Sequence, residues 1–178
     1  MHKNIQTIYQ ETIAFAALKH GNQKMPNGLP YVVHLSNVAM EVFMTHKKEP
    51  NFNIELAIQL ALLHDVLEDT PLSFKELEDT FGNIVATGVL ALTKNASLDK
   101  KDQMQDSLAR IVKQGKEVAI VKLCDRITNL QKPPLKWNKE KIKKYHLQAA
   151  TIAQVLGGKN SYLDNRTQEK IKAYTAFV

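Results

Sequence analysis

The segment ALLHDVLEDT, residues 61–70, places one histidine and three carboxylates directly behind a run of apolar residues. On a continuous helix residues four apart share a face, so His64 would lie near Glu68. By the same spacing, Asp65 would lie near Asp69. Imidazoles and carboxylates bind divalent metals and carry protons. The segment therefore predicts a site for metal binding or proton transfer on a helix that enters the core.

Two further polar residues interrupt apolar sequence elsewhere. Asp125 stands inside EVAIVKLCDRITNL, and His34 stands inside PYVVHL. An unpaired buried charge at Asp125 would cost on the order of several kcal/mol, so we expect a cation beside it.

These residues would close around one divalent metal if their helices converge in a bundle: His34, His64, Asp65 and Asp125. Mixed nitrogen and oxygen ligands suit Mn, Fe, Co, Ni or Zn better than calcium. The alternative is that the histidines are hydrogen-bonded core residues and that Asp125 pairs with Arg126. The adjacent His64–Asp65 pair is the most specific part of the pattern.

The elements that would position these side chains are helical. Three-to-four apolar spacing predicts a helix over residues 4–20, followed by a loop with two prolines and two glycines. A second helix is predicted around Val38, Val42 and Phe43. A third begins near Asn53 and runs through Val66 until Pro71 stops it. Ser73 and Glu76 predict a capping box for a short helix that ends at Gly82. Further helical patterns cover residues 83–93, 99–114, 117–131, 138–156 and 164–177.

Composition sets the broad class. The 178 residues are 44% hydrophobic and 24% charged, which is typical of an ordinary globular protein, and no alternating strand pattern is convincing. We therefore predict one all-α domain built as a helical bundle. The single cysteine, the polar start MHKNIQ and the lack of any apolar run near ~18 residues favour a cytoplasmic protein without a membrane partner.

The order of His34, His64 with Asp65, and Asp125 resembles the HD-domain phosphohydrolases, which are all-helical metal enzymes that cleave phosphate esters. Within that superfamily, the words KHGNQ, GLPYVVH, ALLHDVLEDT, FG and VKLCDRITNL are similar to the hydrolase domain of RelA/SpoT proteins and small alarmone hydrolases. The similarity covers residues 10–132 approximately. It implies a single HD-type domain over residues 1–178, in which a C-terminal helical extension occupies about 138–178.

The resemblance also implies roles. It assigns His34, His64, Asp65 and Asp125 to one divalent ion, usually Mn²⁺, and it assigns Glu68 and Asp69 to the attacking water or the leaving group. Asn129 matches an asparagine that orients a substrate hydroxyl or phosphate, although an asparagine near a helix end is also a common surface residue.

Substrate contacts are where this chain departs from the pattern. Met25 stands where the family usually has an arginine against the guanine base, and Gln131 and Lys132 replace a later arginine and threonine. Tyr31 could stack on a base or serve as a packing anchor. Several lysines could bind pyrophosphate as point charges, and we expect only one or two to act. These candidates are Lys24, Lys94, Lys100, Lys101, Lys122 and Lys132.

The function expected from this resemblance is metal-dependent hydrolysis of a phosphorylated nucleotide, with guanosine 3′,5′-bis(diphosphate) as the substrate and pyrophosphate as a product. Two alternatives stay open. The departures at Met25 and Gln131 motivate an HD phosphatase of different specificity, acting on another nucleotide or a dinucleotide cofactor. A non-catalytic nucleotide sensor is disfavoured by the intact Glu68 and Asp69.

The net charge of +6 favours an anionic partner, and small phosphates qualify as well as nucleic acid. The cluster KWNKEKIKKYH combines lysines with Trp137 and Tyr145, but Glu140 interrupts it and the spacing fits an exposed amphipathic face. We therefore do not expect a nucleic-acid partner. A homo-oligomer stays an open alternative, because no pattern identifies a contact surface.

Overall fold

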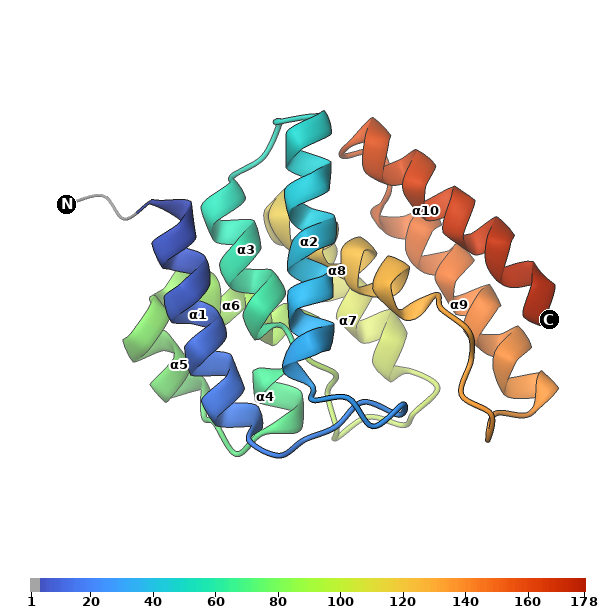
Figure 1. Cartoon of the computed structure of the whole chain (residues 1–178), viewed down its shortest axis with the longest axis horizontal. Helices are drawn as coiled ribbons and strands as arrows, with labels where there is room; N and C mark the ends of the chain where they lie inside the picture. The colour runs from blue at the N-terminus through green and yellow to red at the C-terminus, as the bar shows by residue number, and fades with distance from the viewer. Residues whose placement is uncertain (1–3) are drawn as a thin grey trace.

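The computed structural model describes residues 4–178, so the first three residues of the polar start MHKNIQ lie outside the described residues. Apart from an isolated bridge between Lys24 and Pro30, the regular structure of the described part is helical (Figure 1). The all-α prediction is confirmed. The helices are α1 (Ile5–His20), α2 (Val32–Lys48), α3 (Ile54–Leu63), α4 (Val66–Asp69), α5 (Phe74–Phe81), α6 (Asn83–Leu92), α7 (Gln103–Val112), α8 (Lys116–Asn129), α9 (Lys139–Leu156) and α10 (Ser161–Tyr174), followed by a short 3₁₀ turn η1 (Thr175–Phe177).

Side-chain caps fix where several helices begin. Asn53 accepts a hydrogen bond from the Leu56 amide at the start of α3, as expected of asparagine at this position. At the start of α5, Ser73 and Glu76 form the predicted capping box, in which each side chain binds the other's backbone amide. The short helix therefore starts and ends where the sequence predicts, with Gly82 after its last residue.

The core forms where α2, α3 and α8 pack against one another, with α1 and α6 beside them (Figure 1). Helix α3 is buried on nearly all sides, and Leu60, Leu62 and Leu63 are fully buried. Burial of such a side chain contributes about 1.5–3 kcal/mol. The centre of the bundle therefore holds rigidly the helices that carry the polar residues of interest.

The predicted third helix is not continuous, which corrects the expectation of one helix up to Pro71. Helix α3 ends at Leu63, and α4 begins at Val66, with Asp65 at φ −107° and ψ −1° between them. On an unbroken helix the side chains of His64 and Asp65 would point about 100° apart. The break instead lets both side chains turn to one place in the core.

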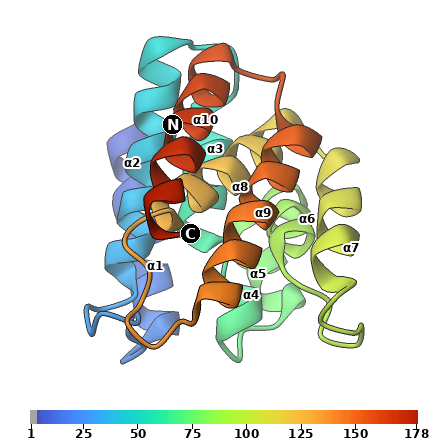
Figure 2. The same cartoon turned by 90° about the vertical axis from the view of Figure 1, so that its right-hand side faces the viewer.

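Helices α9 and α10 form a hairpin that packs on α8, as both views show (Figures 1 and 2). Its inner face and Leu130, which follows α8, form a second small apolar cluster that includes Ile142 and Tyr174. Arg166 on α10 also pairs with Glu41 on α2 at 2.9 Å. The division into a core at about 10–132 and an extension at about 138–178 stays a prediction.

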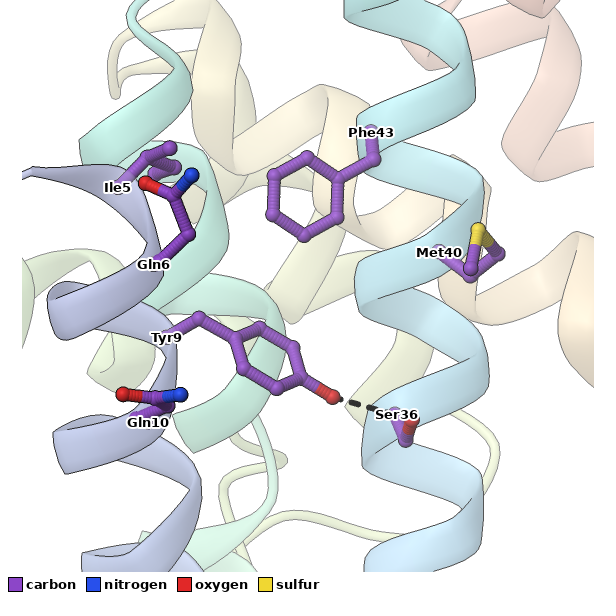
Figure 3. Close-up of a pocket in the computed structure, with 7 residues that line it drawn as sticks. All are labelled: Ile5, Gln6, Tyr9, Gln10, Ser36, Met40 and Phe43. Atoms are coloured by element: carbon purple, nitrogen blue, oxygen red, sulfur yellow. Dashed lines mark hydrogen bonds between the residues drawn. The ribbon is translucent and has the colours of Figure 1, made fainter.

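A separate groove lies between α1 and α2 (Figure 3). Tyr9 reaches across it, with its hydroxyl 3.1 Å from the hydroxyl of Ser36, and Gln10 and Met40 stand at its edges. None of the described helices is long and apolar enough to cross a lipid bilayer.

Candidate metal centre

Three separate parts of the chain bring their side chains together in the core. His34 lies in the first turn of α2, His64 and Asp65 occupy the break between α3 and α4, and Asp125 lies on α8. The Nε2 atoms of His34 and His64 are 3.3 Å apart. One ligand atom from each of His34, His64 and Asp125 lies within 4.8 Å of the others, so these three form a possible metal site.

Asp65 adjoins this group. Its Oδ2 lies 3.0 Å from Nε2 of His64 and 3.8 Å from Nε2 of His34. The hydroxyl of Tyr31 donates a hydrogen bond to the same Oδ2. The four residues predicted to share one ion are thus brought together, with Asp65 at the side of the site that Tyr31 covers.

The donor set suits a divalent ion. Nδ1 of His64 lies 2.8 Å from the Ala61 carbonyl oxygen, and a ring N–H that donates there leaves Nε2 available as a ligand in the neutral ring. Metal-bound histidines usually make such a bond with their second nitrogen. Two imidazoles and two carboxylates are ligands that transition metals accept readily.

The electrostatics of the site favour positive charge. Burial alone would lower the pKa of His64, but the Asp65 carboxylate first and then Asp125 outweigh burial and raise the pKa to about 9. Burial would raise the pKa of Asp125, but Lys122, His34 and His64 together hold it well below its usual range. The carboxylates that hold a proton on His64 would equally attract a metal cation.

The cation expected beside Asp125 is Lys122, whose Nζ lies 3.2 Å from Oδ2. Asn129 donates a hydrogen bond to Oδ1 of Asp125 at 2.5 Å. Arg126 turns the other way and stacks on Tyr145, with its guanidinium carbon 4.2 Å from the ring centre. The alternative pairing of Asp125 with Arg126 is therefore not what the structure shows.

The acidic pair Glu68 and Asp69 lies on α4, one turn beyond the His64–Asp65 break, and both residues are exposed. Lys94 holds Glu68 at both oxygens, through its Nζ at 2.5 Å and its backbone amide at 3.0 Å. Asp69 accepts a hydrogen bond from the Gln23 side chain at 2.8 Å. The two carboxylates thus stand at the solvent side of the buried centre with different partners.

A cavity of about 920 Å³ opens beside Asn129. Asn129, Met25 and Lys132, three of the predicted substrate contacts, line it together with Gln131. Its remaining walls come from the loop before α2, the end of α8, the segment between α8 and α9, and α9 itself, and they are Pro26, Asn27, Thr128, Pro133, Pro134, Leu135, Lys136, Trp137 and Tyr145. The three departures from the family pattern therefore meet in a single cavity.

The other predicted substrate contacts lie apart from this cavity. Tyr31 is half-buried, and its ring packs between His20 and His34 while its hydroxyl binds Asp65. Lys24 is exposed in the loop between α1 and α2, where its backbone bridges Pro30. Neither residue lines the cavity, and neither do the other candidate lysines Lys94, Lys100, Lys101 and Lys122.

Several contacts in the site could not be read from sequence. The bonds of Lys94 to Glu68 and of Gln23 to Asp69 join residues 26 and 46 positions apart. Trp137 stands in the basic segment but faces the cavity. Only the match of KHGNQ to a family pattern gave a signal for Gln23.

The chain is similar to a known protein family and to several named proteins. The HD domain family model matches residues 12–160. The guanosine-3′,5′-bis(diphosphate) 3′-pyrophosphohydrolase MESH1 of Danio rerio is 33% identical over 175 residues, which cover 95% of this chain and 95% of that protein. The protein of the same name from Drosophila melanogaster is 31% identical over 167 residues, which cover 90% and 91%.

Among solved structures, a metazoan ortholog of SpoT described as hydrolysing ppGpp superposes with a TM-score of 0.81. It is 28% identical, and the match covers 97% of each chain. An HD domain implies a divalent metal, and His34, His64 and Asp125 are the group that could hold it. The chain belongs to the HD domain family, and MESH1- and SpoT-type proteins are among its homologues.

Proposed function

We propose that this chain is a metal-dependent phosphohydrolase that removes pyrophosphate from the 3′ position of guanosine 3′,5′-bis(diphosphate) (ppGpp). One observation carries the proposal. Two imidazoles and two carboxylates converge in the core, and the acidic pair Glu68 and Asp69 follows one turn later. We propose ppGpp as the substrate because the MESH1 relatives are named as hydrolases of this nucleotide.

We propose His34, His64, Asp65 and Asp125 as the ligands of one ion, Mn²⁺. When bound, such an ion polarises phosphoryl oxygens and lowers the pKa of a water molecule. Tyr31 orients Asp65 through its hydroxyl, and the Ala61 carbonyl orients the His64 ring. Lys122 and Asn129 orient the Asp125 carboxylate, because Lys122 contacts Oδ2 and Asn129 donates to Oδ1.

Glu68 and Asp69 are the proton carriers of the proposal. Lys94 already occupies both oxygens of Glu68, whereas Gln23 binds one oxygen of Asp69. Asp69 is therefore better placed to accept the proton of the attacking water. The water oxygen bonds to phosphorus as the bond from phosphorus to ribose O3′ breaks. The O3′ atom takes up the proton that the acidic pair removed from the water, and GDP and pyrophosphate leave.

The cavity beside Asn129 would take the nucleoside. Met25 and the aromatic residues Trp137 and Tyr145 offer apolar surfaces to a flat base. Lys132 and Lys136 bring positive charge to the same cavity. Lys24, at the exposed loop, and Lys122, beside Asp125, are the proposed contacts for phosphate groups.

A second candidate is an HD phosphatase of different specificity. Met25, Gln131 and Lys132 all line the cavity that would bind the nucleoside. The residues that depart from the family pattern are therefore the ones that would determine which substrate binds. Such an enzyme would keep the proposed metal ligands and proton carriers. It would release phosphate from another phosphorylated nucleotide or a dinucleotide cofactor.

The test is to incubate the Mn²⁺-loaded protein with ppGpp and separate the products. Equal amounts of GDP and pyrophosphate would support the proposal. No turnover of ppGpp, together with phosphate release from another member of a nucleotide panel, would favour the second candidate. Tight binding of ppGpp with no chemical change would favour a nucleotide sensor and would contradict both enzymes.

The proposal includes a cytoplasmic location and one domain over residues 1–178. It does not include a nucleic-acid partner. The oligomeric state is left open, and size-exclusion chromatography with light scattering would determine it.

A further inference from the structure

A line of side-chain hydrogen bonds joins the end of α1 to Asp69. Nδ1 of His20 lies 2.7 Å from Oε1 of Gln23, and Nε2 of Gln23 donates to Oδ2 of Asp69 at 2.8 Å. His20 is only 6% exposed, although it is the last residue of its helix. The proposed metal ligands and substrate contacts do not include His20 or Gln23, so their arrangement needs its own explanation.

The direction of each bond follows from the chemistry of its ends. An ionised carboxylate only accepts hydrogen bonds, so Gln23 must turn its NH₂ group to Asp69 and its oxygen to His20. Nδ1 of His20 must then carry the proton. Nε2 of His20 is buried and has no hydrogen-bond partner among residues 4–178. The line therefore has a single orientation.

The backbone and the aromatic rings hold this line in place. The Gln23 amide donates to the His20 carbonyl at 3.0 Å, and the Gln23 carbonyl accepts from the Tyr31 amide at 3.0 Å. The His20 ring stacks on the Tyr31 ring, with 4.8 Å between centroids and an interplanar angle of 28°. Gln23 is thus fixed at its backbone and at both ends of its side-chain amide.

The hydrogen bonds described above restrict the position of the Asp69 side chain. It is exposed at the end of the four-residue helix α4, where a carboxylate would otherwise move between rotamers. A proton acceptor must lie within hydrogen-bonding reach of the water that it deprotonates. The bond from Gln23 restricts the Asp69 carboxylate to one orientation.

We propose that His20 and Gln23 are positioning residues that aim the Asp69 carboxylate at the attacking water. This inference rests on the role that the proposed function gives to Asp69. Neither residue needs to touch the substrate or the metal, and their effect should therefore appear in the rate of the chemical step rather than in binding.

The first test is Gln23→Leu, which removes the amide at nearly constant size. We expect kcat for ppGpp to fall on the order of 10–100-fold, while KM and Mn²⁺ content stay at wild-type values. Gln10→Leu is the matched control, because Gln10 lies in the groove between α1 and α2 away from Asp69 (Figure 3). A Gln23→Leu enzyme with wild-type kcat would overturn the inference.

His20 allows a second, independent pair of variants. His20→Phe keeps a ring against Tyr31 but has no donor for Gln23, so kcat should fall on the order of 10-fold without a lower melting temperature. His20→Asn loses the ring but can place an N–H where Nδ1 was, so kcat should be closer to that of the wild type. The reverse order would show that His20 acts through packing alone.

A double-mutant cycle separates this inference from the function on which it rests. If Gln23 acts through Asp69, adding Gln23→Leu to Asp69→Asn should slow the enzyme no further. Equal slowing in both backgrounds would overturn the positioning role while leaving hydrolysis of ppGpp intact. If the wild type does not cleave ppGpp, the same cycle is measured with p-nitrophenyl phosphate and Mn²⁺. A wild type inactive on both would overturn the function and the inference together.

Discussion

The Nε2 atoms of His34 and His64 face each other at 3.3 Å in the interior of the protein. Two ring nitrogens this close cannot both present a proton to the other. Asp125 lies 3.4 Å from the first nitrogen, and Asp65 lies 3.0 Å from the second. The arrangement is favourable when one cation lies among these four groups, which is the basis of the predictions below.

Asp65→Ala should abolish both metal binding and turnover. The substitution removes the carboxylate nearest to His64 and the acceptor of the Tyr31 hydroxyl. Inductively coupled plasma mass spectrometry should find about one Mn²⁺ per wild-type chain and almost none in the variant. Asp79→Ala is the control, because Asp79 is an exposed partner of Lys75 on α5. Retention of Mn²⁺ by Asp65→Ala would contradict the ligand assignment.

Glu68→Gln should keep the metal and lose most of the rate. Glu68 is held by Lys94 outside the group of proposed ligands, and its amide replacement cannot carry a proton. Loss of a proton carrier typically costs about 10²–10⁴-fold in kcat. Steady-state kinetics and metal analysis on the same sample check both parts. A variant as fast as the wild type would remove Glu68 from the proposed chemistry.

Tyr31→Phe should weaken metal binding without unfolding the protein. The ring contacts with His20 and His34 remain, whereas the hydrogen bond to Asp65 is lost. Removal of a group that supports a metal ligand usually costs about 10–100-fold in affinity or activity. Isothermal titration with Mn²⁺ measures the effect. Tyr9→Phe, which removes the hydroxyl facing Ser36 in the groove of Figure 3, should bind as the wild type does.

Lys132→Met should raise KM for ppGpp and leave kcat nearly unchanged. Lys132 lines the cavity, and hydrogen bonds to charged groups contribute about 1.5–3 kcal/mol, or roughly 10–100-fold in KM. Lys172→Met is a matched control, since Lys172 is exposed on α10. Equal KM values for Lys132→Met and the wild type would show that Lys132 does not contribute to substrate binding.

Acid should weaken the attachment of the C-terminal hairpin through Glu49. The Ser161 hydroxyl, and then the Tyr162 amide, lower the pKa of Glu49 below its usual value of 4.5. A lowered pKa in the folded state means that the charged form adds stability above pH 4.5, which is lost as the pH falls further. Glu49→Gln should therefore melt below the wild type at pH 7, and the difference should shrink below pH 4.5. A gap that does not depend on pH would contradict this.

The sequence predicted the helical architecture well because its signals are local. The capping residues Asn53 and Ser73 start their helices where expected, and Gly82 follows the end of α5. The break between α3 and α4 was not predicted, because apolar spacing continues through it. At the break Asp65 accepts a hydrogen bond from the distant Tyr31, a tertiary contact that no local pattern contains.

The candidate site shows the same contrast. Residue type and family resemblance predicted that His34, His64, Asp65 and Asp125 meet, and the structure places them together. The partners of the acidic pair were not predicted, because Gln23 and Lys94 reach Asp69 and Glu68 from distant loops. The bond of the Tyr31 hydroxyl to Asp65 was also not predicted, and the stacking of Tyr31 on a base stays a prediction.

The most direct test of the metal centre is to locate the ion itself. Crystals grown with Mn²⁺ should show one anomalous diffraction peak at the manganese absorption edge, within bonding distance of both Nε2 atoms and of the Asp65 and Asp125 carboxylates. A strong peak elsewhere, or no peak between His34 and His64 at saturating Mn²⁺, would contradict the proposed centre.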